Sequence, residues 1–306
     1  MTELILHHYE GSPFAHKIRA IFGFKGLAWR SVEIPMIMPK PDLMPLSGGY
    51  RRTPVLQSGA DIYHDTQLIA AELERRHPAP TLYPNGGEGM AHALTFWADG
   101  ALFGATTGAA FAHIADRMPP AFFADRAAMR GQEPAPPEKI MAAAPRLVAE
   151  LNRTMHLVEG WLADGRPFLL GDAAGLADFS IFHPFWMLNR TGRKNAALLE
   201  PFPKIRGWVE RIEAMGTGSP ADMDAKEALD AAKAADPADP GESEPDDAGP
   251  ALGQTVSVLA ADRVPDAVIG EVVAVRRNAV VVRREDARVG TVHNHFPRFG
   301  YHIRPA

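Results

Sequence analysis

The first 84 residues contain short apolar runs that alternate with amphipathic segments. An apolar run of strand composition comes first, and after a Gly-Ser-Pro turn the apolar side chains recur at the spacing of a helix. We predict the order strand, helix, strand, irregular segment, strand, strand, helix, at residues 4–9, 14–22, 28–34, 35–47, 54–57, 61–63 and from 65 onward. The first two strands should be parallel, since a helix connects them in a right-handed crossover. This order predicts an α/β domain over residues 1–84.

From residue 89 to residue 215 the apolar positions follow a helical period, without a convincing strand. Four helices are predicted, at residues 90–118, 138–163, 176–188 and 202–215. A stretch rich in Pro and Ala, residues 119–137, separates the first two. We therefore expect an all-helical second domain over residues 85–221.

Charge divides the remaining residues into two segments. Residues 222–250 carry ten acidic and two basic side chains, which predicts an acidic linker with a short frayed helix at residues 224–235. Residues 251–306 carry eight arginines and five acidic residues and form a small β-rich unit, with predicted strands at residues 254–259, 268–275, 279–283, 289–293 and 301–304. Because a unit this short without a disulfide has a marginal core, we expect it to dock on the body or on a partner subunit.

Composition excludes several classes of protein. The chain has 306 residues, of which 46% are hydrophobic and 23% charged, the balance of an ordinary soluble globular protein. It contains no cysteine, so disulfide scaffolds, thiolate metal sites and catalysis through a protein thiol are excluded. The sequence lacks an apolar run of about 18 residues and the basic start of a signal peptide, which indicates the cytoplasm and no membrane partner.

Three short motifs place polar groups where a helix or a strand begins. Ser12 and Pro13 suit the start of a helix, because Ser accepts from a free helix N–H and Pro lacks the donor that would go unused there. Pro54 precedes a strand, where its missing donor does no harm. Asp65 and Thr66 are both helix-capping residues. Each motif alone has a purely structural explanation.

Taken in order, the motifs Gly11-Ser12-Pro13-Phe14-Ala15-His16-Lys17-Ile18-Arg19, Arg52-Thr53-Pro54-Val55-Leu56 and Asp65-Thr66 resemble the thioredoxin-like N-terminal domain of the cytosolic glutathione transferases. The resemblance implies an α/β plus all-α fold, a thioredoxin-like domain followed by a helical bundle, and the small all-β C-terminal appendage is not typical of that family. It implies a homodimeric transferase that activates the glutathione thiol for attack on a small apolar electrophile. Glutathione would be a co-substrate, with no metal or redox cofactor.

The resemblance also assigns the thiol partner. The hydroxyl of Ser12 is expected to donate to the glutathione sulfur, with Tyr9 as the second choice. Related proteins often have cysteine at the position of Ser12; without any cysteine, glutathione itself must be the nucleophile. Arg52 is expected to pair with a glutathione carboxylate, with Arg51 and Lys40 as alternatives.

The remaining glutathione contacts are implied for the second and third motifs. The backbone of Thr53, before an expected cis Pro54, would pair with the cysteinyl part of glutathione as a strand does. Asp65 and Thr66 would hold the γ-glutamyl group at a helix N-terminus. Asp178, after a Gly175 cap, resembles the family's buried capping aspartate and is expected to be structural.

An apolar pocket for the electrophile is expected along the first long helix. The residues proposed for it are Trp97, Phe103, Phe111 and His113, with Phe122 and Phe123 nearby. Aromatic residues at helical spacing are also typical of a plain core, which stays an alternative for each of them. The insert at residues 119–137 is a candidate lid.

Other functions remain open at this point. A non-catalytic scaffold of the same fold could use the C-terminal β unit for protein recognition. Arginines around residues 276–284 could bind nucleic acid, although a solvated edge explains them better at the unit's modest net charge. His293 and His295 share a face of a predicted strand but lack an evident third ligand, so no metal site is predicted.

Overall fold

The computed structural model describes residues 2–244, 249–262 and 267–306, and it begins with the expected α/β arrangement. The elements of this part are β1 (Ile5–His8), α1 (Pro13–Phe24), β2 (Ala28–Glu33), α2 (Met44–Ser47), β3 (Val55–Ser58), β4 (Asp61–His64) and α3 (Thr66–Arg76). β1 pairs in parallel with β2 and antiparallel with β3, and β3 pairs antiparallel with β4. The predicted order and the parallel pairing of the first two strands are confirmed.

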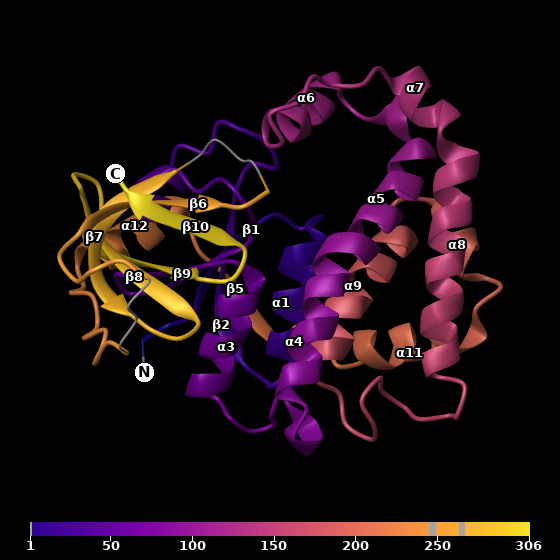
Figure 1. The fold of residues 1–306 in the computed structure, drawn as a ribbon, viewed down its shortest axis with the longest axis horizontal. Coiled ribbons are helices and arrows are strands. Elements are labelled where there is room, and N and C mark those ends of the chain that lie inside the picture. Colours follow the sequence, from indigo (N-terminus) through magenta and orange to yellow (C-terminus); the bar gives the residue numbers. More distant parts are fainter. Residues whose placement is uncertain (1, 245–248, 263–266) are drawn as a thin grey trace.

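The middle of the chain is helical and forms the opposite side of the molecule from the C-terminal strands (Figure 1). Its helices are α4 (Glu88–Trp97), α5 (Phe103–Ala112), α6 (Pro120–Ala128), α7 (Pro137–Ala142), α8 (Ala144–Trp161), α9 (Leu176–Arg190), α10 (Arg193–Ala196) and α11 (Pro203–Glu213). Every side chain of α9 from Leu176 to Leu188 is buried, and α9 packs against α1, α4 and α11. In the part of the chain that the structure describes, no helix combines the length and the apolar character needed to cross a lipid bilayer.

Two of the predicted helices are interrupted. The one expected at residues 90–118 consists of α4 and α5, joined by a π-helical turn at Ala98–Leu102, and it ends at Ala112. The one expected at residues 138–163 is divided at Ala143 into α7 and α8, because Pro145 has no N–H to donate and occupies the first turn of α8. The insert between them contains α6, which composition did not predict.

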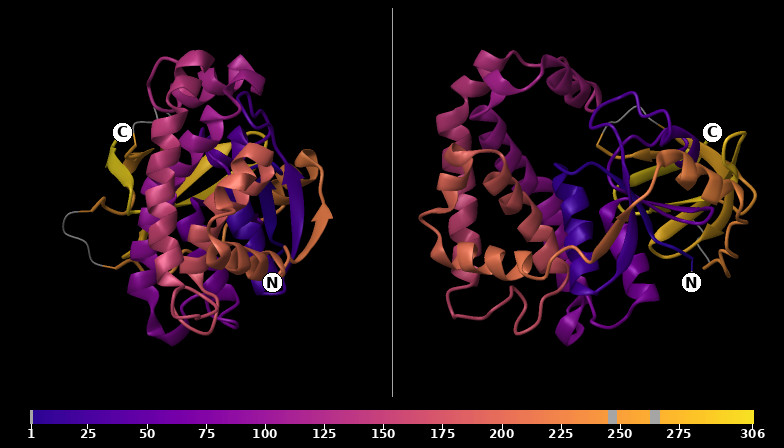
Figure 2. Two further views of the ribbon diagram at one scale, coloured as in Figure 1. Left: turned by 90° about the vertical axis from the view of Figure 1, so that its right-hand side faces the viewer. Right: turned by 180° about the vertical axis from the view of Figure 1, so that it is seen from behind.

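The last part of the chain extends the N-terminal sheet at both edges. Its elements are β5 (Ser219–Asp222), α12 (Ala225–Lys233), β6 (Thr255–Ala260), β7 (Val268–Val275), β8 (Ala279–Asp286), β9 (Gly290–Pro297) and β10 (Tyr301–Pro305). The described strands form one sheet in the order β10-β6-β7-β8-β9-β4-β3-β1-β2-β5. β9 pairs in parallel with β4, and β5 pairs in parallel with β2. The C-terminal β unit thus docks on the body by continuing its sheet (Figure 2).

The segment expected to be an acidic linker is partly folded onto the sheet. Asp224 caps α12, and the helix buries Ala228, Leu229 and Ala232. Its polar residues lie on the other side, so a composition that cannot fold alone still supplies one apolar helix face to a larger core. Within residues 222–250, residues 245–248 lie outside the described part of the chain.

The two faces of the sheet belong to different hydrophobic clusters, because successive strand residues point to opposite sides. Leu6 and Leu56 pack in the cluster that contains α1, α3 and the helical region. Ile5 and Val55 pack in a second cluster with α12 and the valines of the C-terminal strands. The C-terminal unit therefore shares a core with the N-terminal strands.

Candidate functional site

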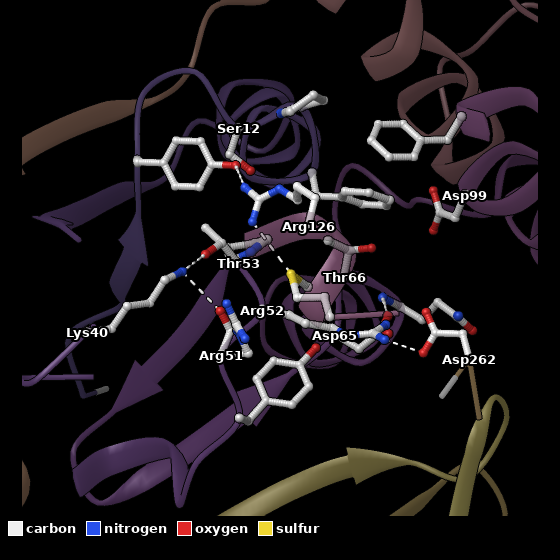
Figure 3. Close-up of a pocket in the computed structure, with 18 of the residues that line it drawn as sticks. Ser12, Lys40, Arg51, Arg52, Thr53, Asp65, Thr66, Asp99, Arg126 and Asp262 are labelled. Carbon is white, nitrogen blue, oxygen red and sulfur yellow. Dashed lines mark hydrogen bonds and ion pairs between the residues drawn. The ribbon is translucent and has the colours of Figure 1, made fainter. Parts of the chain in front are cut away.

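A cavity of about 350 Å³ lies between the α/β part and the helical part of the protein (Figure 3). The residues proposed from the sequence that line it are Tyr9, Ser12, Lys40, Arg51, Arg52, Thr53, Pro54, Asp65, Thr66 and Phe103. They come from the turn after β1 and the start of α1, the segment between β2 and β3, and the starts of α3 and α5. Three motifs that are far apart in the sequence therefore meet at one cavity.

Ser12 stands at the beginning of α1, directly after the turn that follows β1. Its Oγ accepts a hydrogen bond from the Ala15 N–H at 3.2 Å, and its own N–H donates to the Tyr9 carbonyl at 3.0 Å. The side chain is only 2% exposed, yet it borders the cavity. Because Oγ accepts from the helix, its own hydrogen is available to a group inside the cavity.

The second motif contains the expected cis peptide bond between Thr53 and Pro54. A buried lysine supports the segment before it: Lys40 Nζ donates to the Thr53 hydroxyl at 3.0 Å and to the Arg51 carbonyl at 2.9 Å. Burial lowers the pKa of Lys40 to about 8, and the Arg126 cation acts in the same direction. Lys40 is thus a cation at the cavity wall that loses its proton more readily than an ordinary lysine.

The third motif begins α3 in an unusual backbone conformation. Asp65 has a φ of 71°, which places a non-glycine residue in the left-handed region, a strained arrangement common at functional sites. Its carboxylate accepts from the Gln67 N–H at 3.0 Å and caps the helix. Burial raises the pKa of Asp65. Thr66, next to it, is 4% exposed and lines the same cavity.

A buried charge network, which no sequence motif indicated, supports this helix start. Lys17 Nζ pairs with the Asp99 carboxylate at 2.9 Å and donates to the Thr66 hydroxyl at 3.2 Å. His183 Nε2 lies 3.0 Å from the other oxygen of Asp99. Although burial favours the neutral acid, Lys17 and His183 hold the pKa of Asp99 below its ordinary value. The available signal was Lys17 itself, a lysine on the apolar face of α1.

Helix α6 connects the helical part to the other side of the cavity. Asp125 accepts from the Met38 N–H at 3.1 Å and pairs with Arg51. Arg126 donates to the Tyr9 hydroxyl at 3.3 Å and to the Met36 carbonyl at 3.2 Å, and its side chain lines the cavity. The insert expected to be a lid therefore places a docked helix beside Tyr9.

The four residues expected for the electrophile pocket lie in different surroundings. Phe103 lines the cavity and packs on Phe14 with ring centroids 4.6 Å apart. Trp97 instead packs on Trp161 within the helical core, and Phe111 packs against Phe122 and Phe123. His113 Nδ1 lies 2.7 Å from the Asn195 side-chain oxygen. All four residues are half-buried, and helical spacing did not reveal which of them border the cavity.

Two family models match the sequence. Residues 6–81 match the N-terminal domain of glutathione S-transferase, and residues 113–220 match a domain of unknown function (DUF7962). No protein of curated function matches the chain.

Solved structures extend the likeness to the whole chain. A GST-like protein from Pseudomonas syringae is 38% identical, with 100% of both chains covered and a TM-score of 0.80. A glutathione S-transferase from Rhodospirillum rubrum is 20% identical, with 69% of this chain and 88% of that chain covered and a TM-score of 0.54. A Tau class glutathione S-transferase from mango, Mangifera indica, is 16% identical, with 69% and 89% covered and a TM-score of 0.54, and these two show the fold alone.

The full-length likeness includes the C-terminal strands, which continue the sheet beyond the thioredoxin-like and helical parts. The predicted combination of a thioredoxin-like N-terminal part, a helical part and a C-terminal β region is confirmed. The chain therefore belongs to the glutathione transferase family.

Proposed function

We propose that the protein is a glutathione transferase that activates the glutathione thiol for attack on a small apolar electrophile. The observation that supports this most is the meeting of Ser12, the cis Thr53-Pro54 bond and the start of α3 at one cavity. Each of these groups has a structural role of its own, but the fold does not require all three to border the same cavity.

In this proposal Ser12 stabilises the thiolate of bound glutathione. Its Oγ is held by the Ala15 N–H and its hydrogen is free to donate to sulfur. The positive end of the α1 dipole favours the same anion. Lowering the pKa of the thiol by one unit requires about 1.4 kcal/mol of preferential binding of the thiolate, which a single hydrogen bond to a charged group can supply. Tyr9 is the second candidate for this role.

The tripeptide would lie across the other two motifs. The Thr53 backbone pairs with the cysteinyl residue of glutathione, as the edge of a strand does. The α-carboxylate of the γ-glutamyl group binds at Thr66 and the α3 N-terminus, and its α-ammonium group pairs with Asp65. The glycyl carboxylate would pair with Arg52, with Arg51 and Lys40 as the alternative cations of the cavity wall.

The electrophile would enter beside the sulfur, against Phe14, Phe103 and Met129. These side chains supply apolar surface, and Arg126 forms another part of the cavity wall. Because the chain has no cysteine, no mixed disulfide with the protein is available, and the sulfur that forms the new bond is that of glutathione. A homodimeric state and a cytoplasmic location, both expected from the resemblance and the sequence, belong to the same proposal.

Calorimetric titration with glutathione, combined with a conjugation assay on chlorodinitrobenzene, tests the proposal. We expect saturable binding at micromolar to millimolar glutathione and a conjugation rate that saturates over the same range. A lack of binding at millimolar glutathione would reject the enzyme and favour the non-catalytic scaffold. Sedimentation analysis of the intact chain measures its oligomeric state separately.

A further inference from the structure

The C-terminal strand β10 reaches the start of α3 from outside the two parts that form the cavity. The parallel pairing of β9 with β4 aligns Tyr63 with His295, and the chain then returns as β10, which begins at Tyr301. The Tyr301 ring packs on Phe296, with centroids 6.0 Å apart. Its hydroxyl lies 3.2 Å from the carboxylate oxygen Oδ2 of Asp65. The last strand of the protein therefore contacts a residue of the candidate site.

The hydroxyl groups of Tyr50 and Tyr301 form a chain of two hydrogen bonds that ends at Asp65. The hydroxyls of Tyr50 and Tyr301 are 3.2 Å apart, and each carries one hydrogen. An ionised carboxylate only accepts, so Tyr301 donates to Asp65 and Tyr50 donates to Tyr301. Tyr50 and Asp65 line the cavity, and Tyr301 completes the chain of donors behind them.

This contact holds the second oxygen of the carboxylate. Oδ1 of Asp65 is held by the Gln67 N–H, whereas Oδ2 receives the Tyr301 hydroxyl. Two donors on the two oxygens determine the plane of the carboxylate and favour its ionised form. An anion of fixed orientation is what a cationic ligand group needs at this position.

A second contact joins the C-terminal unit to the same cavity. Asp262, just after β6, pairs with Arg52, and both side chains line the cavity. The C-terminal unit thus contacts two residues of the expected glutathione-binding motifs through two different side chains.

We propose that Tyr301 is a positioning residue for glutathione, which holds the Asp65 carboxylate in the orientation that receives the α-ammonium group of the γ-glutamyl residue. This inference rests on the proposed function. It makes the C-terminal β unit part of the substrate site, although that unit lies outside both the thioredoxin-like and the helical parts.

The test uses the full-length protein with Tyr301→Phe, which removes one hydroxyl and keeps the ring on Phe296. We expect the Kd for S-methylglutathione and the KM for glutathione to rise about fivefold to tenfold, with kcat changed less than twofold, because only ground-state binding of a remote group is weakened. Tyr83→Phe is the matched control, since Tyr83 lies outside this cavity, and it should leave both constants unchanged.

An analogue separates positioning from a general structural effect. In the S-methylated analogue with a butyryl group in place of γ-glutamyl, the α-ammonium and α-carboxylate groups are both absent; a second analogue, with a glutaryl group there, lacks the ammonium alone. Tyr301→Phe should bind both analogues as the wild type does, since the ammonium is what the Asp65 carboxylate receives. An equal loss for S-methylglutathione and for the ammonium-free analogue would show a structural effect and overturn the inference.

Asp65→Asn provides a second background. With the charge removed, adding Tyr301→Phe should cause no further loss of affinity; an additive loss contradicts the inference. If the wild type binds glutathione and Tyr301→Phe binds it equally well, the inference fails and the proposed function stands. If the wild type binds no glutathione, the proposed function fails and the inference fails with it.

Discussion

The Ala15 N–H donates to the Ser12 hydroxyl at 3.2 Å, so a single oxygen both begins α1 and borders the cavity. Replacing Ser12 by Ala should therefore have two effects. Loss of the cap should lower the free energy of unfolding by about 1 kcal/mol. Loss of a hydrogen bond to a thiolate, worth about 1.5–3 kcal/mol, should lower kcat/KM roughly 10- to 100-fold.

The pKa of bound glutathione, measured from thiolate absorbance, distinguishes these effects. It should be higher in Ser12→Ala than in the wild type, whereas Ser12→Thr should keep both the cap and most of the shift. Tyr9→Phe should leave the thiol pKa unchanged. A full conjugation rate in Ser12→Ala together with a loss in Tyr9→Phe would transfer the role to Tyr9.

The lowered pKa of Lys40 predicts that the affinity for a glutathione ligand depends on pH. Its pKa is lowered to about 8 by burial, so near pH 8 it is protonated in about half of the molecules. A bound carboxylate favours the charged form and raises this pKa, so binding of S-methylglutathione should take up a fraction of a proton near pH 8 and weaken as the pH rises above it. Calorimetry in two buffers of different ionisation enthalpy measures the uptake.

The control is Lys40→Met, in which the uptake near pH 8 should disappear and the affinity should be lower at pH 7. Using the S-methylated ligand removes the titration of the thiol from the measurement. Identical uptake in the wild type and in Lys40→Met would mean that Lys40 does not contact the ligand.

The hydrogen bonds of Asp178 predict that its replacement lowers the stability of the fold and leaves the candidate site unchanged. One carboxylate oxygen accepts from the Leu169 N–H and the Trp208 ring N–H, both at 2.9 Å, and the other accepts from the Gly175 N–H at 3.0 Å. Asp178→Ala leaves three buried donors unpaired, at about 1–3 kcal/mol each, so the free energy of unfolding should fall by about 3 kcal/mol or more.

Urea unfolding measures this loss, with the exposed Asp172→Ala as its control. The folded fraction of Asp178→Ala at low temperature should keep the wild-type Kd for glutathione. A changed Kd in that fraction would give Asp178 a role at the site.

Leu229 tests whether the segment after β5 belongs to the core. It is 3% exposed on α12, in the cluster shared with the C-terminal strands. Leu229→Ala should lower the free energy of unfolding by about 2–5 kcal/mol, as for other buried leucines. The exposed Lys226→Ala on the same helix should change it by less than about 0.5 kcal/mol. Equal stability of the two variants would show that α12 is only loosely attached.

Local chemistry made part of the site predictable. A serine followed by proline, a proline before a strand and an aspartate that can cap a helix each specify a local structure, and each was placed correctly in the sequence. The resemblance then supplied the reason to group them. Their meeting at one cavity depends on the sheet order, of which the strand-helix-strand pattern implied only the parallel pairing of β1 with β2.

Contacts across long stretches of chain were not predictable. Tyr301 approaches Asp65 only because β9 pairs with β4, and no local pattern indicates which edge of a sheet a distant strand will join. Helical spacing likewise identifies a buried face but not its neighbours, so Phe103 and Phe111 could not be separated. The acidic composition around α12 concealed an apolar face of three small or aliphatic residues.

The pairing of β4 with β9 joins the two ends of the protein, since Asp61 and His295 contact each other across 234 positions. A ribosome completes β4 long before it has made β9. During that interval the outer N–H and C=O groups of β4 have no permanent partner, and an open strand edge pairs readily with other chains. Messages truncated near their 3′ end should therefore yield aggregation-prone products rather than a smaller folded protein.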